Sequence, residues 1–327
     1  MRKLLLILAL GLVLAGCSGY PEGTLVFVTN ERDGSISVID AATDTVIDTI
    51  STGARPRGIR MGEDGKFAYV ALSTPMNAKP RPDDNRIIVI DTSNGKIVRS
   101  VQVGTDPEQL AVNADQTLLY VSNEDVGTAT ITDLKSGQPI ATLITGIEPE
   151  GVTISPDGKW VYVMAETSST VTVIDTAKQQ VVKTFLVGTR PRDAAFSPDN
   201  TRAYVSAEIG QNLSVVDVAT HTVTATVPLG YDETVKPVGV AVSPDGKTVY
   251  IANGRGNSVS FMNAENLKID STIPVGNRVW GIGLTRDGKK LYAANGISNH
   301  VSVIDTESKK VTTTIQTGQG SWGVAIR

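Results

Sequence analysis

Short runs in which hydrophobic and polar residues alternate recur along almost the whole chain, and no stretch keeps the 3.6-residue spacing of an amphipathic helix. These runs are rich in Val, Ile and Thr and are bounded by Gly, Pro, Asn or Asp, which is typical of β-strands. The unit that begins at Glu148 shows the pattern in full, with predicted strands at residues 149–155, 160–165, 170–175 and 180–187. The pattern therefore predicts an all-β protein with almost no helix.

A strand that ends in Ile-Asp, or in a close variant, recurs seven times. Its last residue falls at Asp40, Asp91, Asp133, Asp175, Asp217, Asn263 and Asp305, so the intervals are 51, 42, 42, 42, 46 and 42 residues. A period near 42 residues with four short strands in each repeat is the spacing of a β-propeller. We expect each repeat to form one blade, a four-stranded antiparallel sheet.

The two ends of the repeat array complement each other. The first repeat, residues 24–51, supplies three strands and has no innermost strand before it. The C-terminal segment, residues 321–327, has the pattern of an innermost strand with nothing after it. We therefore expect a seven-bladed β-propeller, a single domain at residues 24–327, in which the C-terminal strand joins the N-terminal blade. Such closure removes the free sheet edges of an open array.

The first residues are organised like an export signal. A positive start at residues 1–3 precedes an apolar run at residues 4–15, which is too short to span a bilayer. The run ends in Leu14-Ala15-Gly16-Cys17, which resembles the bacterial lipobox, whose cysteine is acylated. We expect a lipoprotein signal peptide at residues 1–16 and a lipidated Cys17 with a tether at residues 17–23. An ordinary cleaved signal with an incidental cysteine is the alternative.

Lipidation at this position has a consequence for location. Two or more acyl chains anchor a protein stably on a membrane without crossing it. Ser18, directly after Cys17, resembles the sorting rule for the outer membrane. We expect an exported protein that is anchored to the periplasmic side of the outer membrane.

The composition excludes several classes of protein. Lys and Arg total 30 against 34 Asp and Glu, a formal net charge of −4, which excludes a strongly basic nucleic-acid binder. The chain has one cysteine and two histidines, which excludes a disulfide framework, a zinc–thiolate cluster and any site that needs several imidazoles. The single cysteine is the one in the lipobox.

Charged residues gather where each inner strand begins and where the second strand turns into the third. Residues i and i+2 of a strand point the same way, so each charged pair is expected to project together at one opening of the central channel. An acidic arc on blades three and four is then flanked by arginines on blades two and five. The candidate binding residues are Arg55, Arg57, Asp106, Glu108, Glu124, Glu148, Glu150, Glu166, Arg190, Arg192, Glu208, Lys236, Arg278, Trp280 and Trp322.

Two longer loops, residues 73–85 and 229–236, are expected on the same face, and long loops are where binding residues tend to lie. The alternative interpretation is a set of solvated strand ends that pair with one another, with Trp280 and Trp322 closing the channel.

Several motifs resemble those of a known family. Val28-Thr29-Asn30, Tyr120-Val121-Ser122-Asn123 and Ser155-Pro156-Asp157-Gly158 resemble the YVTN-repeat β-propellers over residues 24–327. The order of the less generic motifs, among them Arg-Pro-Arg-Gly, Asp-Pro-Glu and Glu-Pro-Glu-Gly, is similar to the branch associated with PQQ-dependent alcohol catabolism. That branch implies a quinoprotein dehydrogenase or its c-type cytochrome as partner, and provides no catalytic residues to transfer. The lipobox and a Pro-rich loop at residues 75–82 depart from it.

The first functional hypothesis is a binding or accessory protein, expected to be a monomer, that recognises a protein partner or a ligand at its charged opening. Charges of both signs suit a protein partner, because they set orientation and association rate. No group of residues has the pattern of a catalytic site, and no cofactor is required.

The second hypothesis is a metal-assisted, lactonase-like hydrolase that uses the acidic arc. Asp106, Glu108, Glu148 and Glu150 are the candidate ligands of a hard cation such as Ca²⁺, which takes six to eight oxygens. Clustered carboxylates also raise one another's pKa and can supply a general base.

Two further functions have less support from the residues. Nucleic-acid binding at the opening relies on five arginines alone, without an aromatic and basic stripe. A role with haem d1 needs axial ligands, and His221 and His300 are expected at the start of a fourth strand and in a third strand, away from the opening.

Overall fold

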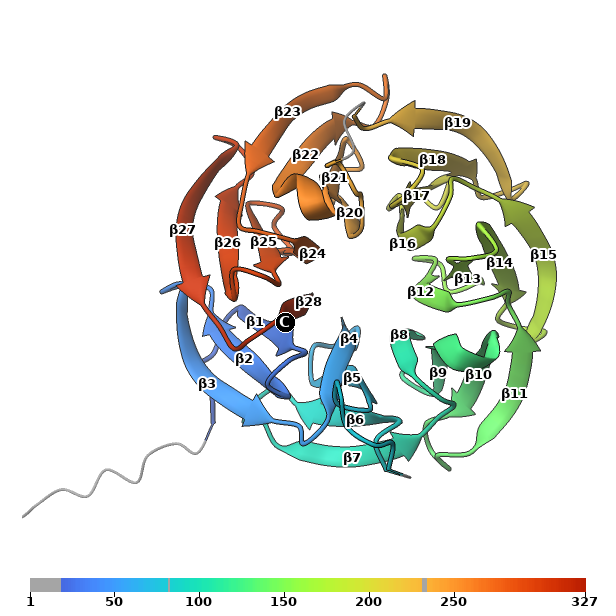
Figure 1. Ribbon diagram of the computed structural model, residues 1–327, viewed down its shortest axis with the longest axis vertical. Helices are drawn as coiled ribbons and strands as arrows, with labels where there is room; N and C mark the ends of the chain where they lie inside the picture. Colours follow the sequence, from blue (N-terminus) through green and yellow to red (C-terminus); the bar gives the residue numbers. More distant parts are fainter. Residues whose placement is uncertain (1–18, 82, 231–233) are drawn as a thin grey trace, which may run out of the picture.

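The strands form seven four-stranded antiparallel sheets arranged in a ring (Figure 1). The computed structural model describes residues 19–81, 83–230 and 234–327. The expected signal peptide and Cys17 lie outside the described residues. The prediction of a seven-bladed, all-β propeller with four strands in each blade is confirmed.

The strands of each blade run from the channel outward. Blade one contains β28 (Ser321–Ile326), β1 (Leu25–Asn30), β2 (Ser35–Asp40) and β3 (Thr45–Ser51). Blade two contains β4 (Arg55–Met61), β5 (Phe67–Ser73), β6 (Arg86–Asp91) and β7 (Ile97–Gln102). Blade three contains β8 (Pro107–Val112), β9 (Leu118–Asn123), β10 (Thr128–Asp133) and β11 (Pro139–Ile144). Blade four contains β12 (Pro149–Ile154), β13 (Trp160–Ala165), β14 (Thr170–Asp175) and β15 (Gln180–Leu186).

The remaining blades repeat this order. Blade five contains β16 (Pro191–Phe196), β17 (Arg202–Ala207), β18 (Asn212–Asp217) and β19 (Thr222–Pro228). Blade six contains β20 (Val240–Val242), β21 (Thr248–Ala252), β22 (Ser258–Asn263) and β23 (Ile269–Pro274). Blade seven contains β24 (Val279–Leu284), β25 (Lys290–Asn295), β26 (His300–Asp305) and β27 (Lys310–Gln316). In the part of the chain that the structure describes, the helical segments are the short 3₁₀ turns η1 (Glu124–Val126) and η2 (Gly254–Gly256).

The ring closes where β28 pairs with β1, as the incomplete first and last repeats predict (Figure 1). The pairing is antiparallel, with Val26 opposite Ile326 and Val28 opposite Val324. Blade one therefore holds the beginning and the end of the chain in one sheet, and its inner edge is not left open.

The core lies between neighbouring blades. The second strands of blades three, four, five and seven each bury a tyrosine, at Tyr120, Tyr162, Tyr204 and Tyr292. Aromatic rings of this size fill the space between sheets that face each other at an angle. The Tyr162 hydroxyl lies 2.8 Å from Nδ1 of His221, and the indole of Trp160 packs edge-on against the same imidazole.

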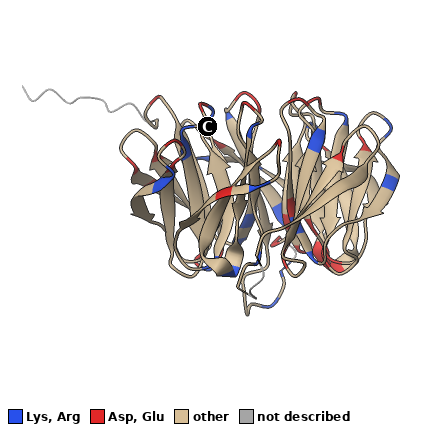
Figure 2. Ribbon diagram, turned by 90° about the horizontal axis from the view of Figure 1, so that it is seen from above, with Lys and Arg blue, Asp and Glu red and all other residues tan. Residues whose placement is uncertain are grey.

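Seen edge-on, the ring is a disc with loops at both faces (Figure 2). We call the face that carries the loops between second and third strands, and between successive blades, the mouth face. His221 lies at the opposite face, at the start of β19, as expected. His300 instead begins β26 at the mouth face, where its Nδ1 lies 3.2 Å from the Asn295 side chain.

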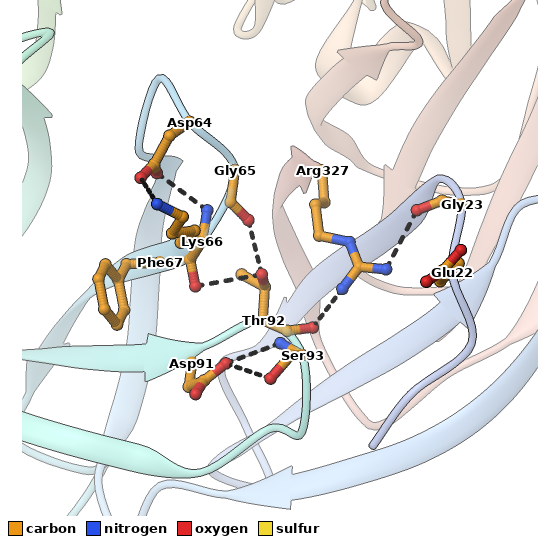
Figure 3. Close-up of a pocket in the computed structure, with 10 residues that line it drawn as sticks. All are labelled: Glu22, Gly23, Asp64, Gly65, Lys66, Phe67, Asp91, Thr92, Ser93 and Arg327. Carbon is orange, nitrogen blue, oxygen red and sulfur yellow. Dashed lines mark hydrogen bonds and ion pairs between the residues drawn. The ribbon is translucent and has the colours of Figure 1, made fainter. Parts of the chain in front are cut away.

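The segment that leads into β1 is fastened to the face opposite the mouth. The Tyr20 N–H donates to the Ser93 carbonyl at 2.6 Å, and the Tyr20 hydroxyl donates to Asp48. Arg327, just after β28, donates to the Pro21 carbonyl at 2.9 Å. It also donates to the Gly23 carbonyl at 3.1 Å (Figure 3). The chain therefore enters the ring at this face. None of the described helical segments has the length and apolar character needed to cross a membrane.

Candidate functional site

Each inner strand places one residue at an equivalent position in the channel, two residues after the turn that enters the blade. We call these residues the channel layer. In blade order from two to one they are Arg57, Glu108, Glu150, Arg192, Val238, Trp280 and Trp322. The layer therefore has an ionic half on blades two to five and an apolar half on blades six, seven and one.

Neighbours in the channel layer contact one another. Arg57 forms an ion pair with Glu108, and Nη1 of Arg192 lies 2.7 Å from Oε2 of Glu150. The ring centroids of Trp280 and Trp322 are 6.1 Å apart. The two arginines join the halves, because the guanidinium carbon of Arg57 lies 5.1 Å from the Trp322 ring centroid and that of Arg192 lies 5.3 Å from the Trp280 ring centroid.

The ionic half is almost completely buried. Glu108 is 0% exposed, Glu150 3% and Arg192 5%. A buried charge is tolerated only when it is paired. Burial raises the pKa of Glu150 to about 7, although the neighbouring Arg192 acts to lower it. Burial likewise raises the pKa of Glu108, against the lowering by Arg57.

A second set of carboxylates lies at the mouth, at the residue that follows the second strand of a blade. Its members are Glu31, Glu124, Glu166 and Glu208. Oε2 of Glu166 lies 2.7 Å from Nε of Arg190, and the same carboxyl group contacts Arg192. Oε2 of Glu31 lies 2.8 Å from Nη2 of Arg55. These arginines and glutamates come from blades one to five and form two groups of ion pairs, one on blades one to three and one on blades four and five.

Glu124 differs from the other three because its partner is another carboxyl group. Burial and a hydrogen bond with Glu108 raise the pKa of Glu124 to about 9. Glu124 is therefore protonated at neutral pH and shares its proton with Glu108. This proton removes one negative charge from the buried half of the channel.

The prediction that the two residues of each charged pair project together at the opening is wrong for blade four, where Glu148 and Glu150 part. In blade three Asp106 and Glu108 stay close, and in blade five Arg190 and Arg192 contact the same Glu166. Strands β8, β12 and β16 begin at the proline, and the residue before it has a left-handed backbone. The φ angles are 46° at Asp106, 55° at Glu148 and 60° at Arg190. Such a turn rotates the preceding side chain away from the strand. Glu148 and Arg190 are exposed, while their partners two residues on are buried.

Two other candidates lie at the entrances to blades six and seven. Lys236 is half-buried ahead of β20, and its N–H donates to the Asn253 carbonyl at 3.0 Å. Arg278 also has a left-handed backbone, with φ 57°. Its Nη2 donates to Oε1 of Glu208 at 3.1 Å, and its guanidinium stacks 4.0 Å from the centroid of Trp280. Arg278 therefore joins the ionic network to the apolar half.

The carboxylates proposed as metal ligands are only partly brought together. Asp106, Glu108 and Glu124 place one oxygen each within 4.8 Å of one another. Glu148 is not in this group and accepts a hydrogen bond from Thr167, whereas Glu150 is bound to Arg192. Within the group, Arg57 already neutralises Glu108 and Glu124 holds a proton. A cation must therefore displace both the Arg57 guanidinium and the Glu124 proton before it can bind deprotonated carboxylates.

Hydroxyl groups of the second strands hold the channel layer, and the sequence analysis did not single them out. The Thr29 hydroxyl accepts the Gly323 N–H and donates to the Arg57 carbonyl, both at 2.8 Å. Ser122 accepts the Gln109 N–H at 3.1 Å and donates to the Glu150 carbonyl at 2.6 Å. These residues are the middle positions of the Val-Thr-Asn and Val-Ser-Asn motifs, so the repeat itself contained the signal.

Two family models match the chain. The model of the choice-of-anchor I domain matches residues 24–192. The model described as lactonase, 7-bladed beta-propeller matches residues 177–326. The acidic group of blade three lies within the first match and outside the second.

Curated relatives match over a short stretch. The uncharacterized protein YncE of Salmonella typhi and that of Salmonella typhimurium strain LT2 are each 36% identical over 67 residues. The stretch covers 20% of this chain and 19% of each relative. The chain therefore matches about a fifth of the length of these relatives.

Solved structures match over most of the chain. A chain of the hydrazine synthase of Kuenenia stuttgartiensis has a TM-score of 0.76 at 23% identity, covering 86% of this chain and 92% of that one. A functionally unknown protein from Desulfotomaculum acetoxidans DSM 771 has a TM-score of 0.78 at 17% identity, covering 93% and 99%. At these identities the likeness concerns the fold.

Proposed function

The chain belongs to the choice-of-anchor I domain family, and on that premise we propose that it is a binding protein whose mouth face recognises a protein partner. The observation that carries the proposal is the division of the charged residues into two sets. The ionic half of the channel layer is paired and buried, whereas Arg190 and Glu148 are exposed around it with charges of opposite sign. Such a rim gives a partner orientation and a fast association rate.

The place where the chain enters the ring supports this function. The segment that holds Tyr20 is fastened to the face opposite the mouth. An acylated Cys17, three residues before Tyr20, anchors that face toward the membrane. The mouth then points away from the bilayer, into the periplasm. On the resemblance of its motifs, the proposed partner is a quinoprotein dehydrogenase or its c-type cytochrome.

The test is co-purification of the partner from detergent-solubilised membranes, with the captured protein identified by its mass and its haem or quinone absorbance. Charge removal at the rim, in Arg55→Ser with Arg190→Ser, is expected to abolish capture and leaves the buried Arg57 and Arg192 in place. The control is Arg286→Ser at the opposite face, where Arg286 bonds the Glu63 carbonyl. Capture that survives the rim substitutions, or that is lost equally in the control, contradicts the proposal.

A second candidate function is acid–base hydrolysis at the acidic arc. It is favoured by one observation, a carboxyl group at Glu124 that holds its proton at neutral pH beside an ionised network. Hydrolysis of a small lactone by the purified protein, lost in Glu124→Gln and retained in Glu148→Gln, is the result that supports this candidate. Absence of hydrolysis in the wild-type protein removes it.

A further inference from the structure

The mouth has one sector in which arginines outnumber carboxylates. At the position of Glu166 and Glu208, which follow the second strands of blades four and five, blades six and seven carry Gly254 and Gly296. At the position of Arg278, blade one carries Gly320. Blade one keeps Glu31 after its second strand, but Glu31 pairs with Arg55 of blade two, and no ion pair joins it to Arg32 or Arg255 in the part of the chain that the structure describes.

This sector contains a hollow of about 550 Å³, a volume in the range of small-molecule sites. We call it the arginine hollow. Its charged and apolar walls are made by Glu31, Arg32, Arg255, Arg278, Trp280 and Ile297. Three arginines and one glutamate therefore line it, and that glutamate is already paired with Arg55 of blade two. Ile297 is 56% exposed and offers an apolar surface at the side of the hollow.

Two glycines shape the hollow. A Cβ atom at Gly296 would lie 2.7 Å from Cδ1 of Trp280, so the indole occupies the space that a side chain at Gly296 would take. A Cβ atom at Gly320 would lie 2.7 Å from Cγ of Arg32, so the arginine stem crosses the vacant position. Both glycines thus allow a binding side chain to lie across the mouth.

The entrance loop of blade seven is held rigidly under the hollow. The Arg278 N–H donates to Oδ1 of Asn257, and the Asn277 N–H donates to Oγ of Ser298, both at 2.8 Å. The Gly296 N–H donates to the Arg278 carbonyl at 2.9 Å. Residues on a fixed loop lose little conformational freedom when a ligand binds.

The three arginines differ in how much of their charge is used. Arg278 donates one Nη to Glu208, and its buried Nη1 has no hydrogen-bond partner among the described residues. Arg32 and Arg255 are exposed, and within residues 19–81, 83–230 and 234–327 neither forms an ion pair. An anion that reaches all three gains charge-assisted hydrogen bonds without displacing an existing carboxylate.

We propose that the arginine hollow binds a small organic polyanion, with two or three carboxylate or phosphate groups on an apolar body that packs against Ile297 and the edge of Trp280. The inference rests on the proposed function, since it names a ligand of the same mouth. The charged groups pair with Arg32, Arg255 and Arg278, whose guanidinium forks suit oxyanions. Such a ligand adds negative charge and an apolar surface to the sector in which arginines outnumber carboxylates.

The test titrates the purified protein with benzene-1,3,5-tricarboxylate and follows calorimetric heat and tryptophan fluorescence. Binding is expected to shift the emission of Trp280 and to weaken as salt concentration rises. Arg32→Ser and Arg255→Ser are each expected to weaken binding about tenfold, equivalent to about 1.4 kcal/mol. Neither residue has an ion pair to lose, and Arg286→Ser at the opposite face is the matched control.

Absence of binding in the wild-type protein, or binding that neither substitution weakens, overturns the proposal. Citrate and inorganic phosphate lack an apolar ring, so they test whether the apolar body of the ligand contributes to binding. Affinities equal to that of the aromatic tricarboxylate refute the contact of an apolar body with Ile297 and Trp280. The single Arg190→Ser variant leaves the arginine hollow and the Arg55–Glu31 pair in place, so it is expected to bind the tricarboxylate while capturing less of the protein partner. Failure of this proposal and failure of partner recognition are therefore separate results.

Discussion

Arg192 Nη1 lies 2.7 Å from Glu150 Oε2, so that a guanidinium group of blade five neutralises a carboxylate of blade four inside the channel. The same guanidinium contacts Glu166 and lies 3.5 Å from Oε2 of Glu208. One side chain therefore balances three buried carboxylates that come from two blades. Its removal leaves Glu150 buried without an ion-pair partner among the described residues, whereas Glu166 keeps Arg190 and Glu208 keeps Arg278.

Arg192→Ala is expected to lower the free energy of unfolding by about 3–5 kcal/mol, because it breaks a buried ion pair and leaves Glu150 uncompensated. Urea denaturation followed by circular dichroism measures the loss. Arg190→Ala is the matched control. Arg190 pairs with the same Glu166, but its side chain is 45% exposed, and the expected loss is about 0–1 kcal/mol. Equal losses in the two variants would show that burial of the network contributes nothing.

The raised pKa values of Glu150, about 7, and Glu124, about 9, predict that stability falls with rising pH. In the unfolded chain both groups return to the ordinary value of 4.5. Between that value and the folded pKa the folded protein binds more protons than the unfolded chain, so the slope of stability against pH is negative. The contribution is fully present below pH 4.5 and is lost as the pH rises through about 7 and then about 9.

Glu124→Gln replaces the protonated carboxyl group by an amide, which still donates a hydrogen bond but does not titrate. The variant is therefore expected to flatten the decline in stability between pH 7 and pH 9. Urea titrations at several pH values measure this slope, and Glu148→Gln at the exposed rim serves as control. An unchanged slope in Glu124→Gln would refute the assignment of the proton to this residue.

Thr29 links three strands, so Thr29→Val is expected to destabilise the ring by about 1–3 kcal/mol. The valine preserves the shape of the side chain but leaves the Arg57 carbonyl and the Gly323 N–H without partners in a buried position. Thr29→Ser retains the hydroxyl and is expected to lose less. Chemical denaturation measures the free energy of unfolding of both variants. If the serine variant is as unstable as the valine variant, the hydroxyl group has no stabilising role.

Arg57 takes the place of a cation beside Glu108, so the wild-type protein is expected to give no calorimetric heat with Ca²⁺ or a lanthanide. In Arg57→Met the carboxyl groups of Asp106, Glu108 and Glu124 lose this guanidinium and are expected to bind the ion. A hundredfold excess of ion over its dissociation constant then stabilises the variant by about 2.7 kcal/mol, measured by thermal unfolding. Heat in the wild-type protein that disappears in Glu124→Gln would instead support metal-assisted hydrolysis.

Much of the fold follows from local pattern. The strands predicted at residues 160–165 and 170–175 are β13 and β14 without a shift at either end. The start and end of such a short strand are set by the alternation of hydrophobic and polar residues and by the turn residues beside it. Each strand requires only its own hydrophobic face and a nearby glycine or asparagine. The pairing of Ser321–Ile326 with β1 also follows, since a repeat array with three strands at one end and one at the other closes in this way.

The candidate site was predicted less well, and Glu148 and Glu150 show why. The sequence makes them an equivalent pair, but the left-handed backbone at Glu148 sends its side chain to the rim and leaves Glu150 alone in the channel. The sequence analysis also did not identify Arg32 and Arg255 as binding residues. They lie in turns that look like ordinary solvated loops until the ring brings blades six and one to either side of blade seven.

The sequence by itself determined the number of blades, the strands and the closure of the ring, because periodicity and alternation act between residues that are close in the chain. The tertiary structure alone decided which charges are buried, which remain on the rim, and that three arginines of three blades share one hollow. The physical reason is that side-chain direction depends on single backbone turns such as Glu148, and that charge balance in the channel depends on partners supplied by other blades.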